Sequence, residues 1–264
     1  KIKEIEYRLP DGMGGVYLRD ETKRGNAREV TVIGQNNGED ESESWLIFER
    51  PVAVPYRDGN CPGQVPIEIA FRLQWNEKEQ REEVARTKDS PLVVFFPTEK
   101  ETRFGFLIQG PYRTTPARDN IPKEDDWNAT LVNETSCLMA DVLPQLKDLG
   151  LLSVSLLEAL PIRADDFPED GMFYPIFDAV RNALLTQDLL PADDGSFVSA
   201  RNAKLARGAD LRKLLDHEQL RKLFQSDATV EWLAGNITQD RTPELRSYLL
   251  NELEVEEITP DSFA

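Results

Sequence analysis

Residues suited to catalysis are few in this chain. It contains one histidine, His217, and two cysteines, Cys61 and Cys137. The cysteines lack the C-x-x-C spacing that is typical of metal and redox sites. His217 lies in a charged Asp-His-Glu-Gln stretch, and no Gly-x-Ser-x-Gly turn supplies a nucleophile beside it. The sequence therefore predicts a surface histidine, no metal site and no independent hydrolase activity.

Two pairs of adjacent carboxylates could in principle transfer protons or bind a cation. They are Asp125 with Asp126, and Asp165 with Asp166. Carboxylates that precede an apolar run more often cap a helix, because their oxygens accept hydrogen bonds from the N–H groups of its first turn. We therefore favour capping over acid–base work or metal binding for both pairs.

Motifs for nucleotide phosphates are absent from the sequence. It has neither a Gly-x-x-x-x-Gly-Lys-Ser/Thr loop nor a Gly-x-Gly-x-x-Gly turn after a strand. The segment Asp11–Gly15 is like a glycine box only superficially, because Met13 stands where such a box needs glycine. A turn between two strands explains its glycines better. We expect this chain alone to bind no cofactor.

The charge balance limits the classes of partner. The chain has 48 acidic and 31 basic residues and a formal net charge of -17, which repels nucleic-acid phosphates and anionic lipid. Arg113 and Arg118 are the best candidates for a local basic patch, although a loop of solvated charges explains them equally well. No run approaches the roughly 20 apolar residues of a membrane span. We expect neither nucleic acid nor a membrane as partner, and a reducing, cytoplasmic location.

The first third of the chain carries short runs rich in β-branched and aromatic residues, typical of strands. A meander of antiparallel strands fits these runs best. Polar or turn-forming segments separate them, and we expect Gln35–Ser44 to form an exposed, mobile loop, with Glu39–Ser44 disordered. The other predicted turns are Asp11–Gly14 and Arg57–Gly63. The predicted strands are Ile5–Leu9, Gly15–Leu18, Glu29–Ile33, Trp45–Phe48 and Ile67–Leu73.

A second pattern follows the meander. The run Pro91–Pro97 is apolar at successive positions, which favours a strand in the middle of the sheet, with Phe104–Gln109 as its hairpin partner. From Asp126 to Asp148 apolar residues recur at helical spacing, which predicts a long helix with a kink at Pro144. The apolar set is Leu131, Cys137, Leu138, Val142 and Leu146.

Beyond Gly150 the spacing of apolar residues is mainly helical. A small hairpin around Asp194–Gly195 interrupts the helices. The expected fold is α+β: residues 1–150 form a mostly antiparallel sheet with a long packed helix, and residues 151–264 form a mainly helical unit. The predicted helices are Phe173–Leu185, Ala209–Leu215, His217–Phe224, Thr229–Ala234 and Thr242–Leu253.

The most distinctive stretch runs from Phe95 to Asn128. Phe96-Pro97 ends an apolar strand, Gln109-Gly110 ends a second, a loop with Arg113 and Arg118 follows, and Trp127-Asn128 opens a helix. This order resembles the segment that follows the ATP-binding module in sacsin-like members of the superfamily of gyrase, heat-shock chaperones, histidine kinases and MutL. A weaker similarity lies at Leu190–Ala200. The resemblance covers roughly residues 45 to 200, from where its motifs begin and end.

The resemblance implies a transducer. In that superfamily the segment senses the γ-phosphate of ATP through a basic residue and passes closure of the module on to regions that bind a client or partner. The superfamily's helix-borne glutamate and asparagine and its Asp-x-Gly-x-Gly box have no counterpart here. We therefore expect a non-catalytic fragment of a larger chaperone-like ATPase. ATP and Mg²⁺ would bind to the parent protein, and the partners would be its upstream ATP-binding module and a protein client.

Four basic residues are candidates for sensing the nucleotide: Arg113 and Arg118 first, then Lys100 and Arg103. Surface salt bridging explains all four equally well. We assign geometric roles to Gly110 and Pro111, and a capping or anchoring role to Trp127 and Asn128. The alternative function is a protein-interaction module of a regulatory or defence protein that binds its partner irrespective of nucleotide.

Overall fold

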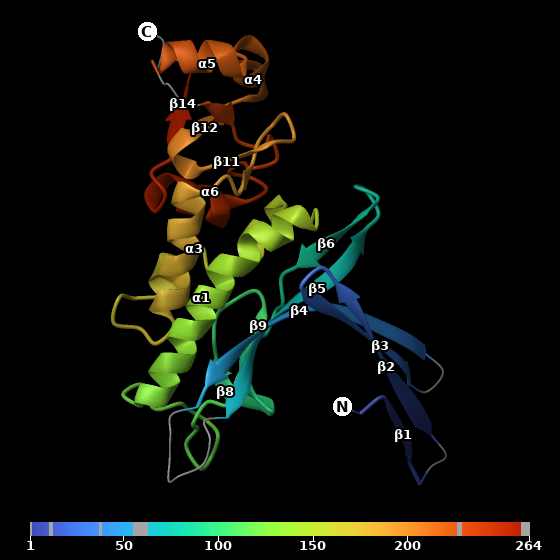
Figure 1. The fold of residues 1–264 in the computed structure, drawn as a ribbon. Coiled ribbons are helices and arrows are strands. Elements are labelled where there is room, and N and C mark those ends of the chain that lie inside the picture. Colours follow the sequence, from blue (N-terminus) through green and yellow to red (C-terminus); the bar gives the residue numbers. More distant parts are fainter. Residues whose placement is uncertain (1, 11–12, 37–38, 55–62, 226–228, 260–264) are drawn as a thin grey trace. The chain divides into compact units, whose positions relative to one another are not determined.

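The computed structural model describes residues 2–10, 13–36, 39–54, 63–225 and 229–259 (Figure 1). The chain divides into two compact units, Lys1–Leu138 and Met139–Ala264. The boundary lies inside the long helix α1 (Asp126–Asp148), whereas the sequence predicts it after residue 150. A helix carries no local signal of where one core ends and the next begins.

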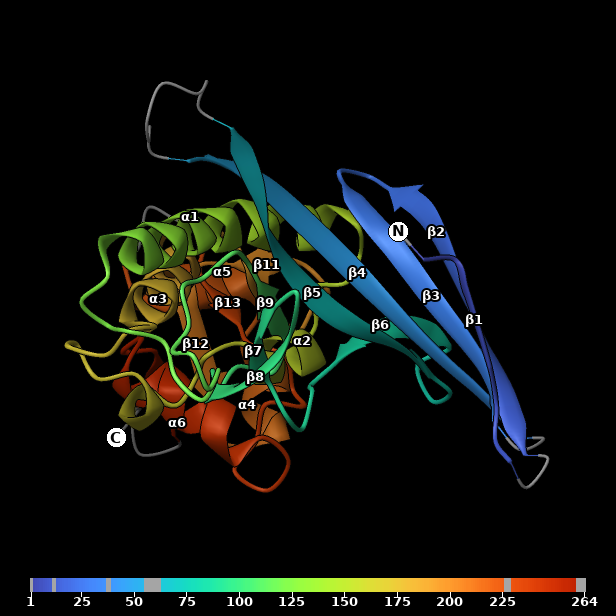
Figure 2. The same cartoon turned by 90° about the horizontal axis from the view of Figure 1, so that it is seen from below.

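A nine-stranded sheet organises the first unit (Figure 2). The strand order is β1-β2-β3-β4-β5-β9-β7-β8, and β6 pairs with β5 off this path. Strands β1 to β5 pair antiparallel in sequence order, so the predicted antiparallel meander is confirmed. The strands are β1 (Glu4–Arg8), β2 (Gly14–Arg24), β3 (Ala27–Asn36), β4 (Glu39–Ala53), β5 (Gln64–Asn76), β6 (Arg81–Ala85), β7 (Pro91–Val94), β8 (Phe96–Glu101) and β9 (Leu107–Gln109).

Strand β5 shows how the sequence builds the core of this unit. Ile67, Ile69 and Phe71 alternate along the strand and are fully buried, because side chains two residues apart point to the same face. The Phe71 ring lies 5.2 Å from that of Phe106, which stacks on Phe104 at 4.8 Å. This aromatic cluster covers the sheet where β9 joins β5.

The segment predicted to be a mobile loop is sheet instead. Strand β3 continues to Asn36 and β4 begins at Glu39, and the two pair from Asn36↔Glu39 to Arg28↔Ile47. The expectation of disorder at Glu39–Ser44 is therefore wrong. Its acidic side chains are exposed on a strand whose backbone is paired, so low hydrophobicity did not prevent order. Half of the first predicted turn (11–12) and most of the second (57–62) lie outside the described residues.

The Pro91–Pro97 run is also divided differently from the prediction. Strand β7 ends at Val94, the chain reverses at Phe95, and β8 is its antiparallel partner. Strand β9, predicted as that partner, pairs parallel with β7 and antiparallel with β5. Phe95 and Phe96 are 77% and 72% exposed, so this part of the run does not enter the core.

Helix α1 confirms the predicted long helix. Leu131, Leu138, Val142 and Leu146 are buried, as their spacing predicts, while Cys137 is exposed. Pro144 lies inside the helix. The first turns of α1 belong to the sheet unit and the later turns to the second unit.

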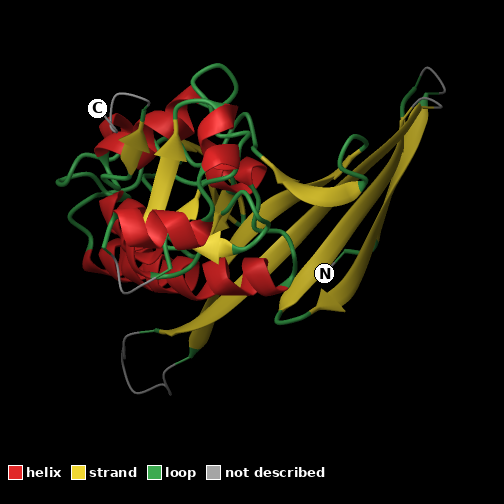
Figure 3. Cartoon of the chain, turned by 90° about the horizontal axis from the view of Figure 1, so that it is seen from above, coloured by secondary structure: helices red, strands yellow, loops and turns green. Residues whose placement is uncertain are grey.

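The second unit combines helices with short strands, so the predicted mainly helical unit is confirmed only in part (Figure 3). The predicted hairpin is present, with Leu190 opposite Val198 and Gly195 at φ +85°, which favours glycine. The predicted helix at Thr229–Ala234 is wrong, because Glu231–Trp232 is a strand. The helices are α2 (Val154–Ala159), α3 (Tyr174–Thr186), α4 (Ala209–Leu214), α5 (His217–Leu223) and α6 (Pro243–Asn251), with short 3-10 turns η1 (Ala164–Asp166) and η2 (Ala200–Asn202). The strands are β10 (Leu190–Pro191), β11 (Phe197–Val198), β12 (Ala203–Ala206), β13 (Glu231–Trp232) and β14 (Glu256–Ile258).

A short parallel sheet explains the strands that the periodicity missed. Strand β12 pairs parallel with β13 on one side and with β14 on the other. These strands have two to four residues, too few for a period-2 pattern to be recognised. Among the described residues, no helix combines the length and the apolar character needed to cross a membrane.

Candidate functional site

The loop between β9 and α1 holds both of the favoured arginines, and Asn128 supports it. The Asn128 side chain is fully buried. Its Oδ1 accepts from the N–H of Arg113 at 2.8 Å, and its Nδ2 donates to the carbonyl oxygens of Arg113 at 2.9 Å and Pro122 at 3.2 Å. One amide thus joins the beginning and the end of the loop to the first turn of α1.

Trp127 and Asp125 complete this support. The indole N–H of Trp127 donates to the carbonyl of Pro111 at 3.0 Å. Asp125 caps α1, because its Oδ1 accepts from the N–H groups of Trp127 and Asn128, both at 3.0 Å. Both ends of the loop are therefore held by the residues that begin the helix.

Arg113 places a cation beside this cap. Its Nη1 lies 2.9 Å from Oδ2 of Asp125, and the two side chains are 46% and 19% exposed. The hydrogen bond from Arg113, followed by the N–H of Asn128, holds the pKa of the Asp125 carboxyl below its usual value. The carboxylate is therefore ionised at neutral pH, and the exposed guanidinium can exchange this partner for another anion.

Arg118 has a different role from Arg113. Its Nη2 donates to the carbonyl of Val94 at 2.7 Å and to that of Phe96 at 3.2 Å. Its own carbonyl accepts from the N–H of Glu99 at 3.3 Å. The guanidinium thus fastens the loop to the turn between β7 and β8. Arg118 is a positioning residue, because two backbone carbonyls accept from its Nη2.

The turn that Arg118 holds presents two aromatic side chains. Phe95 has φ +60°, a left-handed conformation that is uncommon for a bulky residue, and both Phe95 and Phe96 are largely exposed. Strain of this kind persists only where surrounding contacts impose it, and it recurs at functional sites. We call Phe95 and Phe96 the aromatic tip.

Lys100 and Arg103 are not joined to the two loop arginines by any hydrogen bond between described residues. Lys100 is half-buried in β8, and Arg103 follows the strand, exposed and at φ +67°. Within the described part of the chain, neither has a carboxylate at salt-bridge distance. Both are free to meet an external anion.

The remaining motif residues between Phe95 and Asn128 lie in surroundings that indicate a geometric role. A Cβ on Gly110 would lie 3.0 Å from the Tyr112 ring and 3.2 Å from Ile67, so the close approach there favours glycine. Gln109 ends β9 opposite Val93, and Pro97 is exposed in β8. Tyr112 is buried, its hydroxyl lies 3.3 Å from that of Thr135, and burial raises its pKa to about 12.

Sequence reasoning missed two features of this site. It placed Phe95 and Phe96 inside the sheet, and it did not foresee that Arg118 binds carbonyls 22 and 24 residues away. A non-glycine residue with positive φ has no signature in sequence, so neither feature could have been found there. Pro97, two residues after Phe95, was the only hint of an edge position.

The chemistry available to this loop is anion binding. Among the described residues, no three His, Cys, Asp or Glu side chains form a group that could hold a metal ion. His217 is exposed at the start of α5, as predicted, where Asp216 caps the helix.

Comparisons with protein-family models, curated proteins and solved structures found no match to this chain.

Proposed function

We propose that this chain is a non-catalytic part of a larger sacsin-like ATPase and couples nucleotide binding in an upstream module to the binding of a client or partner. One observation carries the proposal: the loop that bears Arg113 is fastened through Arg118 to the aromatic tip. An anion that draws Arg113 from Asp125 would therefore act on a loop that is physically connected to an exposed apolar surface.

In this proposal Arg113 is the residue that senses phosphate. A cation that meets a terminal phosphate stabilises the charge that develops during its transfer. Arg113 suits the role because it is half-exposed and its present partner is a single carboxylate, and such partly exposed pairs contribute little to stability. Arg118 is less suited, since its Nη2 already donates to the two carbonyls that shape the turn, which limits how far the guanidinium can move toward a phosphate.

The test is ATP turnover and nucleotide affinity of the parent protein that carries Arg113→Ala. We expect turnover to fall by about tenfold or more and nucleotide affinity to change little, because the contact forms in the transition state. Arg72→Ala is the matched control, because Arg72 is similarly exposed (45% against 46%) and its nearest carboxylate oxygen, on Glu43, is 3.9 Å away. Equal turnover in both variants would contradict the assignment.

A second function is favoured by the aromatic tip alone. Two adjacent phenylalanines, each more than two-thirds exposed, can anchor a protein partner without any nucleotide. Phe95→Gly separates the two functions, because glycine tolerates φ +60° and should leave the fold intact. If the variant loses its partner equally with and without ATP, the interaction module is the better account.

A further inference from the structure

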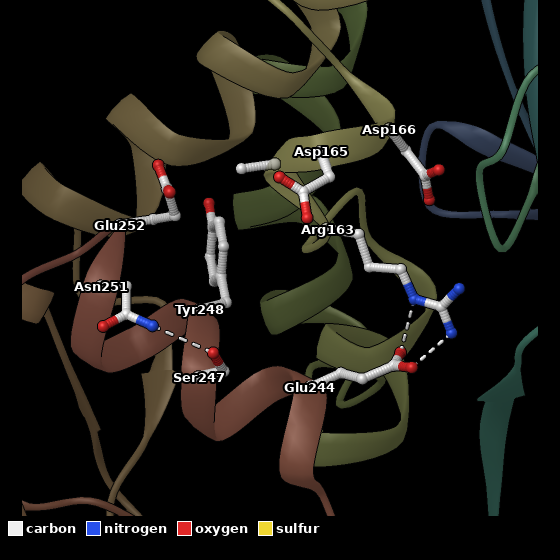
Figure 4. A pocket seen from close by; sticks show the side chains of 9 residues that line it. Arg163, Asp165, Asp166, Glu244, Ser247, Tyr248, Asn251 and Glu252 are labelled. Atoms are coloured by element: carbon white, nitrogen blue, oxygen red, sulfur yellow. Dashed lines mark hydrogen bonds and ion pairs between the residues drawn. The ribbon is translucent and has the colours of Figure 1, made fainter.

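The second unit contains a hollow of about 460 Å³ that the proposed function does not use (Figure 4). One wall is a single face of α6, whose lining residues lie three and four positions apart, and the other is the 3-10 turn η1 with Arg163 before it. The residues from α6 and its C-cap are Glu244, Ser247, Tyr248, Asn251 and Glu252.

Tyr248 carries an unpaired polar atom in this hollow. The residue is 2% exposed, and its hydroxyl has no hydrogen-bond partner among the described residues. A buried hydroxyl without a partner costs free energy, so nearly all such groups in proteins are paired. Figure 4 shows the hydroxyl pointing between Glu252 and Asp165. Burial raises the pKa of this phenol, which therefore stays protonated and can both donate and accept.

The hollow also has an excess of negative charge. Nε of Arg163 lies 2.8 Å from Oε2 of Glu244, so these two charges offset each other. Asp165, Asp166 and Glu252 remain. The nearest cation to Glu252 is Arg181, whose Nε is 3.9 Å from the Glu252 carboxylate and donates to its backbone carbonyl at 3.1 Å.

The type of cation follows from the donor set. The carboxylates here are not among any group of three His, Cys, Asp or Glu side chains, within the described residues, that could hold a metal ion. A phenol oxygen between two carboxylates instead suits a ligand with several N–H donors, since guanidinium and ammonium groups donate to both kinds of oxygen. Asp165 is exposed and the Glu252 side chain is 32% exposed, so both can move aside to admit such a group.

We propose that the hollow between α6 and η1 binds an organic cation, a guanidinium or primary ammonium of the kind carried by arginine and lysine side chains. The N–H groups of the ligand would bind the carboxylates of Glu252 and Asp165 and give the Tyr248 hydroxyl its missing partner. This site is independent of the transducer role, because its residues and its ligand differ from those of the loop between β9 and α1, which we call the arginine loop.

The test is titration of the full chain with N-acetyl-argininamide, followed by the backbone amide shifts of Asp165, Tyr248 and Glu252. We expect saturable shifts, and none with the neutral N-acetyl-glutaminamide. Glu252→Gln should weaken binding about tenfold, because the cation loses its anionic acceptor, and Tyr248→Phe about threefold, because it loses an uncharged acceptor. Tyr248→Phe should fold normally, because it removes an atom that has no partner.

Glu218→Gln supplies the control, since Glu218 is an exposed carboxylate on α5 that does not line the hollow. If it weakens binding as much as Glu252→Gln does, the attraction is only that of net charge and the site is refuted. Spermidine and the peptide Gly-Arg-Gly distinguish the sources: tighter binding of spermidine supports a free polyamine, and tighter binding of the peptide supports a side chain of a partner protein.

Discussion

The arginine loop of the first unit and the hollow of the second differ in whether their buried polar groups have hydrogen-bond partners. In the loop, the buried Asn128 amide makes three hydrogen bonds, and Arg118 donates to two carbonyls. In the hollow, the buried Tyr248 hydroxyl makes none among the described residues, and four carboxylates line it against two nearby cations, Arg163 and Arg181. The loop is complete without a ligand, whereas the hollow lacks a donor.

The difference separates a positioning device from a binding site. A satisfied network fixes the backbone, because moving any member leaves another unpaired. An unsatisfied group stabilises whichever ligand completes it, because the free energy lost in its burial is recovered on binding. Only Arg113, the half-exposed member of the loop, has the freedom to change its partner.

The largest expected effect on stability is that of Asn128→Ala. The change leaves the N–H and carbonyl of Arg113 and the carbonyl of Pro122 without their partner, so we expect a loss of about 3 kcal/mol or more in the free energy of unfolding. Urea denaturation measures it. Asn133→Ala, at an exposed position of the same helix, is the control and should cost under about 0.5 kcal/mol. Equal losses would mean that the buried amide does not hold the loop.

Arg118→Ala should destabilise more than Arg113→Ala. Arg118 makes two hydrogen bonds to carbonyls from a half-buried position, so its loss should cost about 2 kcal/mol. The Arg113 pair with Asp125 is more exposed, and exposed pairs contribute less to stability because solvent screens them. Denaturation of both variants under one condition decides the order. The reverse order would exchange the positioning and sensing roles assigned to the two arginines.

Two buried tyrosines, one in each unit, differ in whether their hydroxyl groups have a hydrogen-bond partner. The hydroxyl of Tyr112 has Thr135 as a partner, and that of Tyr248 has none among the described residues. Tyr112→Phe should therefore cost about 1 kcal/mol, whereas Tyr248→Phe should be neutral or stabilising by a similar amount. Melting temperatures of the two variants test this. Destabilisation by Tyr248→Phe would show that its hydroxyl has a partner in solution and would remove the basis for the cation site.

The smallest expected effect is on how the stability of the protein depends on pH. The folded-state pKa of Asp125 is depressed, so the stability that its ionised form contributes is fully present above its unfolded pKa, near 3.9, and is lost as pH falls through the lower folded value. Asp125→Asn should therefore lower the free energy of unfolding at pH 6 and have a smaller effect at pH 3. Denaturation at the two pH values measures the difference. An effect of Asp125→Asn that does not depend on pH would contradict this electrostatic account.

Much of the fold could be predicted from the sequence because the long elements carry a strong period. The alternation of Ile67, Ile69 and Phe71 marks a strand, and the spacing of Leu131, Leu138 and Val142 marks a helix. The strands at β12 to β14 could not be predicted, since two to four residues show no period and their stability comes from partners far along the chain.

The candidate sites divide in the same way. The sequence could single out Arg113, Arg118 and Asn128, because they lie within one short segment. It could not show that Arg118 binds carbonyls rather than an external anion, or that Asp165 would face Tyr248, which lies 83 positions further along the chain. Such contacts depend on tertiary packing, which a local sequence pattern does not indicate.

The most direct test of the central claim is the pair of effects of Arg113→Ala in the parent protein: ATP turnover on one side and unfolding free energy on the other. The account predicts that turnover falls about tenfold or more, while the free energy of unfolding changes little, because the Arg113 pair is exposed. Arg113→Lys should restore part of the rate, because it keeps the charge but lacks the planar set of N–H donors of a guanidinium. Turnover that is unchanged in Arg113→Ala would contradict the proposal that this loop senses nucleotide.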